Sequence, residues 1–174
     1  MQANFDCLLE RTIPMTIKVG EKIPTATLMH MTDKGPGPVT TDELFGGKKV
    51  VLFALPGAFT PTCSARHLPG YVEHAADFKK KGVDEIICLS VNDAFVMNAW
   101  GKDQNAAGKV HMIADGNGDF TKKVGLELDA SKFGMGHRSQ RYAMVVENGV
   151  VKTLEVEEGG DFKVSAAEHI LSRL

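Results

Sequence analysis

Residues 49–63 read Lys-Val-Val-Leu-Phe-Ala-Leu-Pro-Gly-Ala-Phe-Thr-Pro-Thr-Cys, and this stretch decides the fold. Its first part, 49–55, is a nearly continuous apolar run, which is typical of a strand covered on both faces of a sheet. A Pro-Gly pair ends the strand. Thr60 is a good helix N-cap and Pro61 suits the first helical position, so a helix is predicted to begin just before Cys63.

Downstream of this stretch, predicted helices and strands continue to alternate. Residues 68–78 carry an apolar stripe at helical spacing, and 85–91 form a second apolar run. A strand, a helix and a further strand in this order imply a parallel, right-handed crossover. Asn92-Asp93 can cap the next helix, which runs to about Trp100 and groups its apolar side chains on one side: Phe95, Val96, Ala99 and Trp100.

The C-terminal third predicts antiparallel strands and a last helix. An Asn-Gly pair separates apolar patterns at 141–147 and 150–156, which is a strong hairpin signal. Ser165 and Glu168 have the spacing of a capping box that opens the final helix. The sequence therefore predicts an α/β protein with a thioredoxin-like fold. Its central mixed sheet is flanked by helices and extended at the N-terminus by β-structure.

Length and composition limit the domain organisation and the partners. The 174 residues suit one domain, expected over 15–174, with 1–14 as a mobile extension. A net charge of −2 does not indicate the basic surface that binds nucleic acid. No apolar stretch is long enough to cross a membrane. The first residues resemble neither a secretory signal nor a transit peptide, so we expect a cytoplasmic protein.

Cys63 is the residue with the most specific chemical setting. It falls at the third helical position, where unpaired backbone N–H groups and the helix dipole favour a thiolate and lower its pKa. A helical wheel places its sulfur at the edge of the apolar stripe, part buried and still reachable. The Thr60 hydroxyl is expected to accept the Cys63 N–H, and its own hydrogen is then free to point at the sulfur or at a bound oxygen. The alternative is that Cys63 only fills the core.

Cys63 has no second cysteine at the helix start, and this limits the chemistry that its thiol can perform. A dithiol oxidoreductase needs Cys-x-x-Cys here, but the fourth position is Arg66. One thiolate can instead attack a peroxide and become a sulfenic acid, a step that needs positive charge near the leaving oxygen. Arg141 is the candidate, because its strand should lie beside the strand that leads into Cys63. Arg66 and Arg138 are rivals.

Four segments together resemble a known family. They are Pro56-Gly-Ala-Phe-Thr-Pro-Thr-Cys-Ser64, His67-Leu-Pro-Gly70, Leu89-Ser-Val-Asn-Asp-Ala-Phe95 and Arg141-Tyr-Ala-Met-Val-Val146. In these segments the chain resembles the type II, or peroxiredoxin-5-like, peroxiredoxins of the redoxin superfamily. The resemblance covers nearly all of residues 16–174, and the Pro-x-x-x-Thr-x-x-Cys pattern is its most specific part.

The resemblance implies a thiol-specific peroxidase that reduces hydrogen peroxide and organic (alkyl) hydroperoxides through a cysteine sulfenic acid. In this interpretation Cys63 is the peroxidatic cysteine, Thr60 and Arg141 complete the site, and Pro56 shields it. The resemblance also implies a homodimer. No cofactor and no metal is implied.

The other cysteines bear on how the enzyme is recycled. One branch of the family carries a resolving cysteine just before the last helix, and residues 159–165 contain none. Cys88 matches a cysteine sometimes proposed as resolving, but its position within an apolar strand favours an inert buried thiol. Cys7 could form an intermolecular disulfide. We therefore expect reduction by glutathione with glutaredoxin, and thioredoxin as the second candidate.

Other functions fit parts of the sequence. Cys63, His67 and His74 fall near one helical face and could ligate zinc, but no further ligand accompanies them. A redoxin-fold binding or chaperone-like protein with a vestigial thiol is the main alternative function. A monothiol glutathione transferase is the third.

Overall fold

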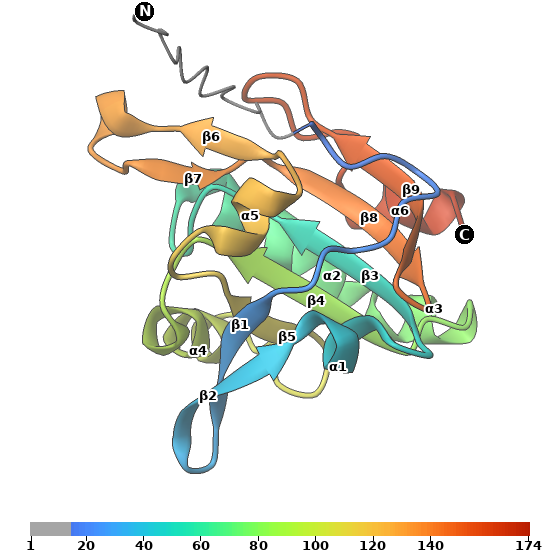
Figure 1. Ribbon diagram of the computed structural model, residues 1–174. Coiled ribbons are helices and arrows are strands. Elements are labelled where there is room, and N and C mark those ends of the chain that lie inside the picture. Colours follow the sequence, from blue (N-terminus) through green and yellow to red (C-terminus); the bar gives the residue numbers. More distant parts are fainter. Residues whose placement is uncertain (1–14) are drawn as a thin grey trace, which may run out of the picture.

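A seven-stranded mixed sheet forms the centre of the protein (Figure 1). The structure is a computed structural model that describes residues 15–174, so Cys7 and the predicted extension 1–14 lie outside the described residues. In sheet order the strands are β2 (Gly35–Thr40), β1 (Thr27–Thr32), β5 (His111–Ala114), β4 (Glu85–Ser90), β3 (Lys49–Ala54), β8 (Tyr142–Glu147) and β9 (Val150–Val156).

The direction of the strands agrees with the predicted thioredoxin-like fold. The three central strands β3, β4 and β5 are parallel, as the crossover predicts, and the outer pairs are antiparallel. Asn148 and Gly149 form the predicted turn between β8 and β9, with φ angles of 45° and 77°. Positive φ at both positions matches the right-handed twist of a tight hairpin, which explains the Asn-Gly pair.

The expected N-terminal β extension is the hairpin of β1 and β2. It joins the sheet through β1, which pairs with β5. β2 contains Pro36 and Pro38, which lack an N–H for the sheet ladder. Because β2 is the edge strand, these prolines cost the sheet little and close this edge to further pairing.

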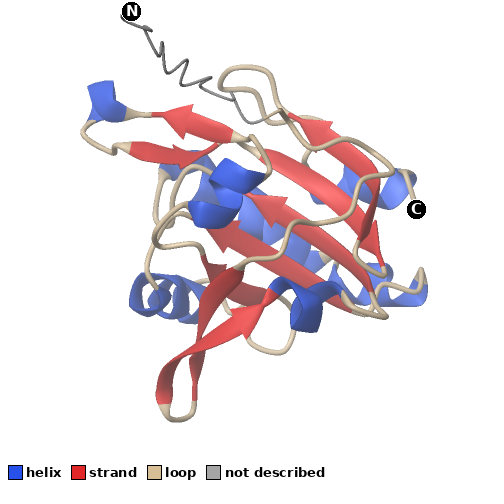
Figure 2. Ribbon diagram, in the orientation of Figure 1, coloured by secondary structure: helices blue, strands red, loops and turns tan. Residues whose placement is uncertain are grey.

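Helices cover both faces of the sheet (Figure 2). They are α1 (Thr41–Phe45), the π-helix η1 (Cys63–His67), α2 (Leu68–Glu73), α3 (Ala75–Lys80), α4 (Ala94–Asp103), α5 (Asp119–Lys123) and α6 (Ala167–Ser172). A short hairpin of β6 (Glu127–Asp129) and β7 (His137–Ser139), with the 3₁₀ turn η2 (Ser131–Phe133), projects from the sheet. None of the helices in the described part of the chain is long and apolar enough to span a bilayer.

Alternate residues of β3 build two separate cores. Val51 and Phe53 face a cluster that includes Tyr71, Trp100 and Ile170, so η1, α2, α3, α4 and α6 lie on that face. The neighbouring residues of β3 face α1 and α5 on the opposite side. Figure 1 shows α5 in front of the central strands and α2 behind them. Burial on both faces explains the nearly continuous apolar run of β3.

Two local predictions are wrong. Asp93 caps α4 as expected, but the predicted apolar side is divided: Trp100 is buried together with Met97, whereas Phe95 is 64% exposed. The sheet beneath the helix decides which of several apolar side chains turns inward, and the helix sequence does not contain that information. The capping box at Ser165 is also absent, since α6 begins without a side-chain cap and the Ser165 hydroxyl donates to Glu157 instead.

Candidate active site

Cys63 lies in the first turn of the helix that follows β3, as predicted. Its side chain is fully buried, with 0% of its surface exposed. The prediction of a part-buried, reachable sulfur is therefore wrong for this conformation. A helical wheel describes only the helix itself, whereas other segments of the chain cover this turn from outside.

The helix around Cys63 departs from α-helical geometry. Between Cys63 and His67 it is a π-helix, and the Leu68 N–H donates to the Cys63 carbonyl five residues earlier. Pro69 follows directly; it has no N–H to donate, and its ring would clash with the carbonyl of Ala65 in a regular α-helix. The wider turn relieves this conflict, and such π turns occur often at functional sites. The helix expected to run unbroken to Phe78 is divided into η1, α2 and α3.

Arg141 lies beside the sulfur, as its position in the sequence predicts. It directly precedes β8, whose first residue, Tyr142, pairs with Ala54 at the end of β3. The Arg141 Nη2 donates to the Cys63 Sγ at 3.3 Å. A guanidinium at this distance stabilises a thiolate by a charge-assisted hydrogen bond.

The two rival arginines make other contacts. Arg138 donates through Nε to the Met135 carbonyl at 2.9 Å and through Nη1 to the Pro56 carbonyl at 3.3 Å. Arg66 is exposed, and its guanidinium lies 4.8 Å from the centre of the Phe162 ring. Of the three candidates, Arg141 is the one whose guanidinium reaches the sulfur.

Thr60 and Pro56 shape the loop in front of the sulfur. The Thr60 hydroxyl donates to the Gly57 carbonyl at 2.7 Å, so the predicted contacts with Cys63 are wrong for this conformation. Glycine at position 57 permits this tight turn, since a Cβ there would lie only 3.0 Å from the Arg138 Nη1 and 3.2 Å from the Thr60 methyl group. Pro56 is partly exposed, and its carbonyl accepts the Arg138 hydrogen bond, so its shielding of the sulfur stays a prediction.

His67, which the sequence offered only within a family motif and as a possible zinc ligand, lies in the candidate site. It is fully buried, and its Nδ1 lies 2.8 Å from the Arg141 Nη1. Its Nε2 lies 3.2 Å from the Ser165 carbonyl. Burial, followed by the charge of Arg141, lowers the pKa of His67 to about 3, so the ring is neutral near pH 7. Its position four residues after Cys63 is a sequence signal for this role, because residues so spaced share a helix face.

Cys88 is fully buried on β4, in agreement with the expected inert thiol. Burial raises the pKa of the Cys88 thiol, and the nearby Cys63 raises it further. A thiol held in its protonated form is a poor nucleophile.

The residues of the zinc alternative make other contacts. Both ring nitrogens of His67 face Arg141 and Ser165, while His74 contacts Asp77 and Glu168. Within residues 15–174 the structure has no group of three or more His, Cys, Asp or Glu side chains arranged to hold a metal ion.

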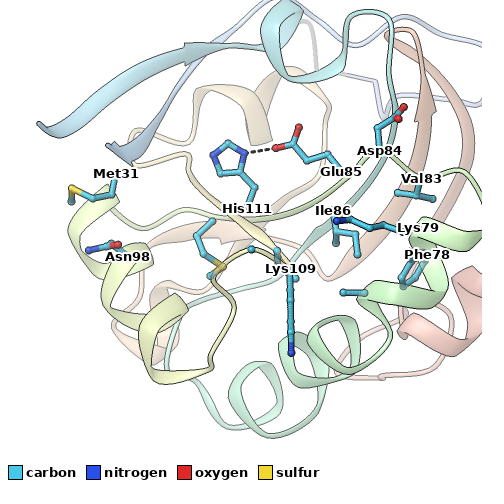
Figure 3. A pocket seen from close by; sticks show the side chains of 14 residues that line it. Met31, Phe78, Lys79, Val83, Asp84, Glu85, Ile86, Asn98, Lys109 and His111 are labelled. Carbon is cyan, nitrogen blue, oxygen red and sulfur yellow. Dashed lines mark hydrogen bonds and ion pairs between the residues drawn. The ribbon is translucent and has the colours of Figure 1, made fainter. Parts of the chain in front are cut away.

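The described part of the chain has a cavity of about 390 Å³, and Figure 3 draws the side chains that line it. Glu85 and His111 line it and are hydrogen-bonded to one another. Glu85 begins β4 and pairs with Val50 near the start of β3, whereas Cys63 follows the end of β3. The cavity is therefore at the opposite end of the parallel strands and holds none of the predicted site residues.

Comparisons with known proteins point to one family. The Redoxin family model matches residues 18–171. Peroxiredoxin-2E, chloroplastic, from Arabidopsis thaliana is 51% identical over 170 residues, which cover 94% of this chain and 72% of that protein. Hybrid peroxiredoxin hyPrx5 from Haemophilus influenzae is 48% identical over 163 residues, which cover 92% of this chain and 67% of that protein.

A solved structure has the same fold at similar identity. Reduced Prx3 from Vibrio vulnificus in complex with H₂O₂ superposes with a TM-score of 0.88 and is 56% identical, over 91% of this chain and 99% of that one.

Proposed function

Because this chain belongs to the peroxiredoxins, the thiol-dependent peroxidases of the redoxin family, we propose that Cys63 is its peroxidatic cysteine. Arg141, Thr60 and Pro56 complete the proposed site within a catalytic domain over residues 15–174. The observation that carries the proposal is the 3.3 Å contact between the Arg141 Nη2 and the Cys63 Sγ.

The proposed reaction is a displacement at a peroxide oxygen. The Cys63 thiolate attacks one oxygen, an S–O bond forms, and the O–O bond breaks. Sulfur loses two electrons and becomes a sulfenic acid, while the leaving oxygen takes up a proton and departs as water or an alcohol. Arg141 stabilises the negative charge on that oxygen, and Thr60 and Pro56 shape the approach.

The proposed substrates are hydrogen peroxide and alkyl hydroperoxides. The similarity to Prx3 of Vibrio vulnificus, whose structure is described as a complex with H₂O₂, supports the first of these. The full burial of Cys63 favours small substrates.

We further propose that glutathione with glutaredoxin reduces the sulfenic acid, with thioredoxin as the second candidate. Cys88 is the only other cysteine in the described residues, and its burial and raised pKa disfavour an internal disulfide. An external thiol must then attack the sulfenic sulfur and release water, and a second thiol must resolve the mixed disulfide.

A homodimer and a cytoplasmic location belong to the same proposal. Phe59 and Phe95 are 54% and 64% exposed, and a second copy of the chain would cover such apolar side chains. For the location, the relative from Arabidopsis thaliana carries the name chloroplastic, so fractionation of the native cell is the direct test.

The first test is peroxide turnover by Cys63→Ser. This variant should lose all measurable turnover with either reductant, because serine is a far weaker nucleophile. After one equivalent of peroxide, mass spectrometry of the wild type should find a trapped sulfenic acid at Cys63. Slow, unselective oxidation would favour a binding protein with a vestigial thiol. Normal turnover by Cys63→Ser would refute the proposal.

The second test compares electron donors in the steady state. Glutathione with glutaredoxin should support a higher kcat/KM than thioredoxin at equal donor concentration. A glutathione mixed disulfide that forms without rapid peroxide consumption would favour a glutathione transferase instead.

A further inference from the structure

The segment after β9 returns to the active site and is held by one carboxylate. Glu157 is only 7% exposed, and its Oε1 accepts hydrogen bonds from the Lys163 N–H at 2.6 Å and the Ser165 N–H at 2.8 Å. The Ser165 hydroxyl donates to the same oxygen at 2.8 Å. The backbone N–H of Glu157 donates to the Arg141 carbonyl at 3.0 Å. Glu157 therefore fixes the loop 157–165 against the residue that contacts Cys63.

The carboxylate of Glu157 is charged under physiological conditions. Its burial alone would raise its pKa, but the hydrogen bonds from Ser165 and Lys163 outweigh burial, and the charge of Arg141 adds to them. The net effect holds the pKa of Glu157 below its usual value. An anion that accepts three hydrogen bonds is a strong anchor for the loop.

Ser165 connects the Glu157 carboxylate to His67 and Tyr71. Glu157 binds both the N–H and the hydroxyl of Ser165, so the carbonyl of Ser165 is fixed in direction. That carbonyl accepts from the Tyr71 hydroxyl at 2.7 Å and lies 3.2 Å from the His67 Nε2. Tyr71 is itself immobilised, since its ring stacks on Phe53 with 3.9 Å between the centroids.

The hydrogen-bond partners of His67 define its tautomer. A carbonyl can only accept, so Nε2 carries the proton and donates to Ser165. A guanidinium can only donate, so Nδ1 is unprotonated and accepts from the Arg141 Nη1 at 2.8 Å. This bond fixes the plane of the guanidinium and directs Nη2 at the Cys63 Sγ.

We propose that Glu157 is a positioning residue of the peroxidase reaction, which acts on Arg141 through Ser165 and His67. The proposal rests on the roles of Cys63 and Arg141 given above. Glu157 does not contact the sulfur. It holds the carbonyl that keeps His67 as an acceptor for Arg141, so that the guanidinium meets the leaving oxygen in the correct direction.

The strand that precedes Glu157 provides a matched control. Glu155 lies two residues earlier on β9 and pairs with Arg173 at 3.3 Å and His169 at 3.5 Å, both on the C-terminal part of the chain. Glu155→Gln removes a carboxylate charge and two contacts with this region, but none of the contacts that lead to Arg141. Its effect measures what a loosened C-terminus alone does to turnover.

The test compares two reactions of Cys63 in the full-length protein. Both reactions need the Cys63 thiolate, but oxidation by hydrogen peroxide also needs a guanidinium aligned with the leaving oxygen, whereas alkylation by iodoacetamide releases iodide and does not. Glu157→Ala should lower the peroxide rate constant at least tenfold and change the alkylation rate less than threefold. Glu157→Gln keeps an acceptor at Oε1 and should recover the rate to within about threefold of wild type. Glu155→Gln should stay within twofold in both reactions.

Several results would overturn the proposal. The first is a peroxide rate constant of Glu157→Ala within twofold of wild type. The second is a loss of peroxide rate in Glu157→Ala that is matched by an equal loss of alkylation rate. The third is an equal loss of peroxide rate in Glu155→Gln. If the alanine variant does not fold, Glu157→Asp replaces it in the test. Its carboxylate is one methylene shorter, so the peroxide rate constant should still fall at least threefold. An unchanged rate constant in Glu157→Asp would equally contradict the proposal.

An independent readout is the tautomer of His67, measured by ¹⁵N NMR. At pH 7 the wild type should show a protonated Nε2 and an unprotonated Nδ1, and Glu157→Ala should show exchange between tautomers. A wild type with protonated Nδ1 would refute the pathway. Arg141→Ala separates the two proposals: if it keeps full peroxide activity, the proposed site is wrong, whereas if it is inactive while Glu157→Ala is unaffected, only the positioning role is wrong.

Discussion

At the scale of residues, the candidate site depends on how a partly buried arginine, Arg141, is compensated. A guanidinium removed from water is costly unless its N–H groups and its charge find partners. Arg141 contacts a neutral imidazole through Nη1 and the sulfur of Cys63 through Nη2. Because His67 contributes no positive charge, the thiolate is the anion that Arg141 favours among these contacts.

The role of Arg141 leads to a quantitative prediction. Arg141→Ala should lower the rate constant for Cys63 oxidation by about 10²- to 10³-fold, the usual loss when one donor to a developing oxyanion is removed. Arg141→Lys should recover only part of this, because a single ammonium cannot hold Nδ1 and Sγ in the planar geometry of a guanidinium. Stopped-flow measurement of Cys63 oxidation tests this. Arg66→Ala is the matched control and should stay within threefold of wild type.

Cys88 should matter for stability and little for oxidation. It is fully buried on β4, so Cys88→Ser places a hydroxyl in an apolar core and should lower the free energy of unfolding by about 1–3 kcal/mol. The rate of Cys63 oxidation should remain within twofold of wild type. Urea denaturation and stopped-flow kinetics measure the two effects, and Cys88→Ala separates the polar penalty from the loss of sulfur. A large loss of turnover in both variants would instead indicate a resolving cysteine.

At the scale of elements, the segment from β3 into η1 brings Cys63 to the end of the sheet. The Thr-Pro start of the helix follows from local propensities and is visible in the sequence. The π turn at 63–67 also has a local cause in Pro69, although the sequence analysis did not use it. The pairing of β3 with β8 is different in kind, because it joins residues about 90 positions apart. That pairing brings Arg141 to Cys63.

The N-cap of α4 offers a test of an element on its own. The Asp93 Oδ1 accepts the Val96 N–H at 2.8 Å. Asp93→Ala should lower the free energy of unfolding by about 1 kcal/mol, since one N–H at the helix end loses its partner. Asp93→Asn keeps an acceptor oxygen and should lower the free energy of unfolding by only a few tenths of that amount. Chemical denaturation measures both, and equal losses in the two variants would argue against the cap.

At the scale of the whole molecule, burial of titratable groups makes the stability depend on pH. His67 has a pKa of about 3 in the folded protein, against 6.5 for an ordinary histidine. Burial also lowers the pKa of His30, with a further contribution from His111. Below pH 6.5 these histidines bind protons in the unfolded chain but bind fewer in the folded protein. The folded state therefore loses stability as the pH falls. His74 opposes this, because its contact with Asp77 raises its pKa, but that pair is exposed and weak.

The acid dependence can be assigned to His67 by substitution. At pH 4.5, His67 should reduce the free energy of unfolding by about 2–3 kcal/mol relative to pH 7, since each pH unit below 6.5 contributes about 1.4 kcal/mol. His67→Asn has no group that titrates there and should show a correspondingly smaller loss. Urea denaturation of both proteins at pH 7, 5.5 and 4.5 measures the difference. Parallel pH profiles would mean that His67 is not the cause.

The sequence alone determined the central strands, the crossover, the β8–β9 hairpin and the position of Cys63 at a helix start. These features depend on apolar periodicity, turn chemistry and capping preferences, which act over a few residues. Residues Pro56, Thr60, Cys63 and Arg141 could all be named from motifs, and Arg141 could be placed because its strand belongs to the same sheet. The Phe95 and Ser165 predictions failed where a distant segment outweighed a local preference.

Only the tertiary structure decided the direction of the Thr60 hydroxyl, the complete burial of Cys63 and the contacts of His67 with Arg141 and Ser165. Each of these depends on atoms that lie far apart in the chain, and no local pattern encodes which carbonyl a buried imidazole meets. Hydrogen bonds inside a protein are satisfied by whatever partner the packing brings within about 3 Å. Packing is a property of the whole fold, so these contacts can be identified only once every element is in place.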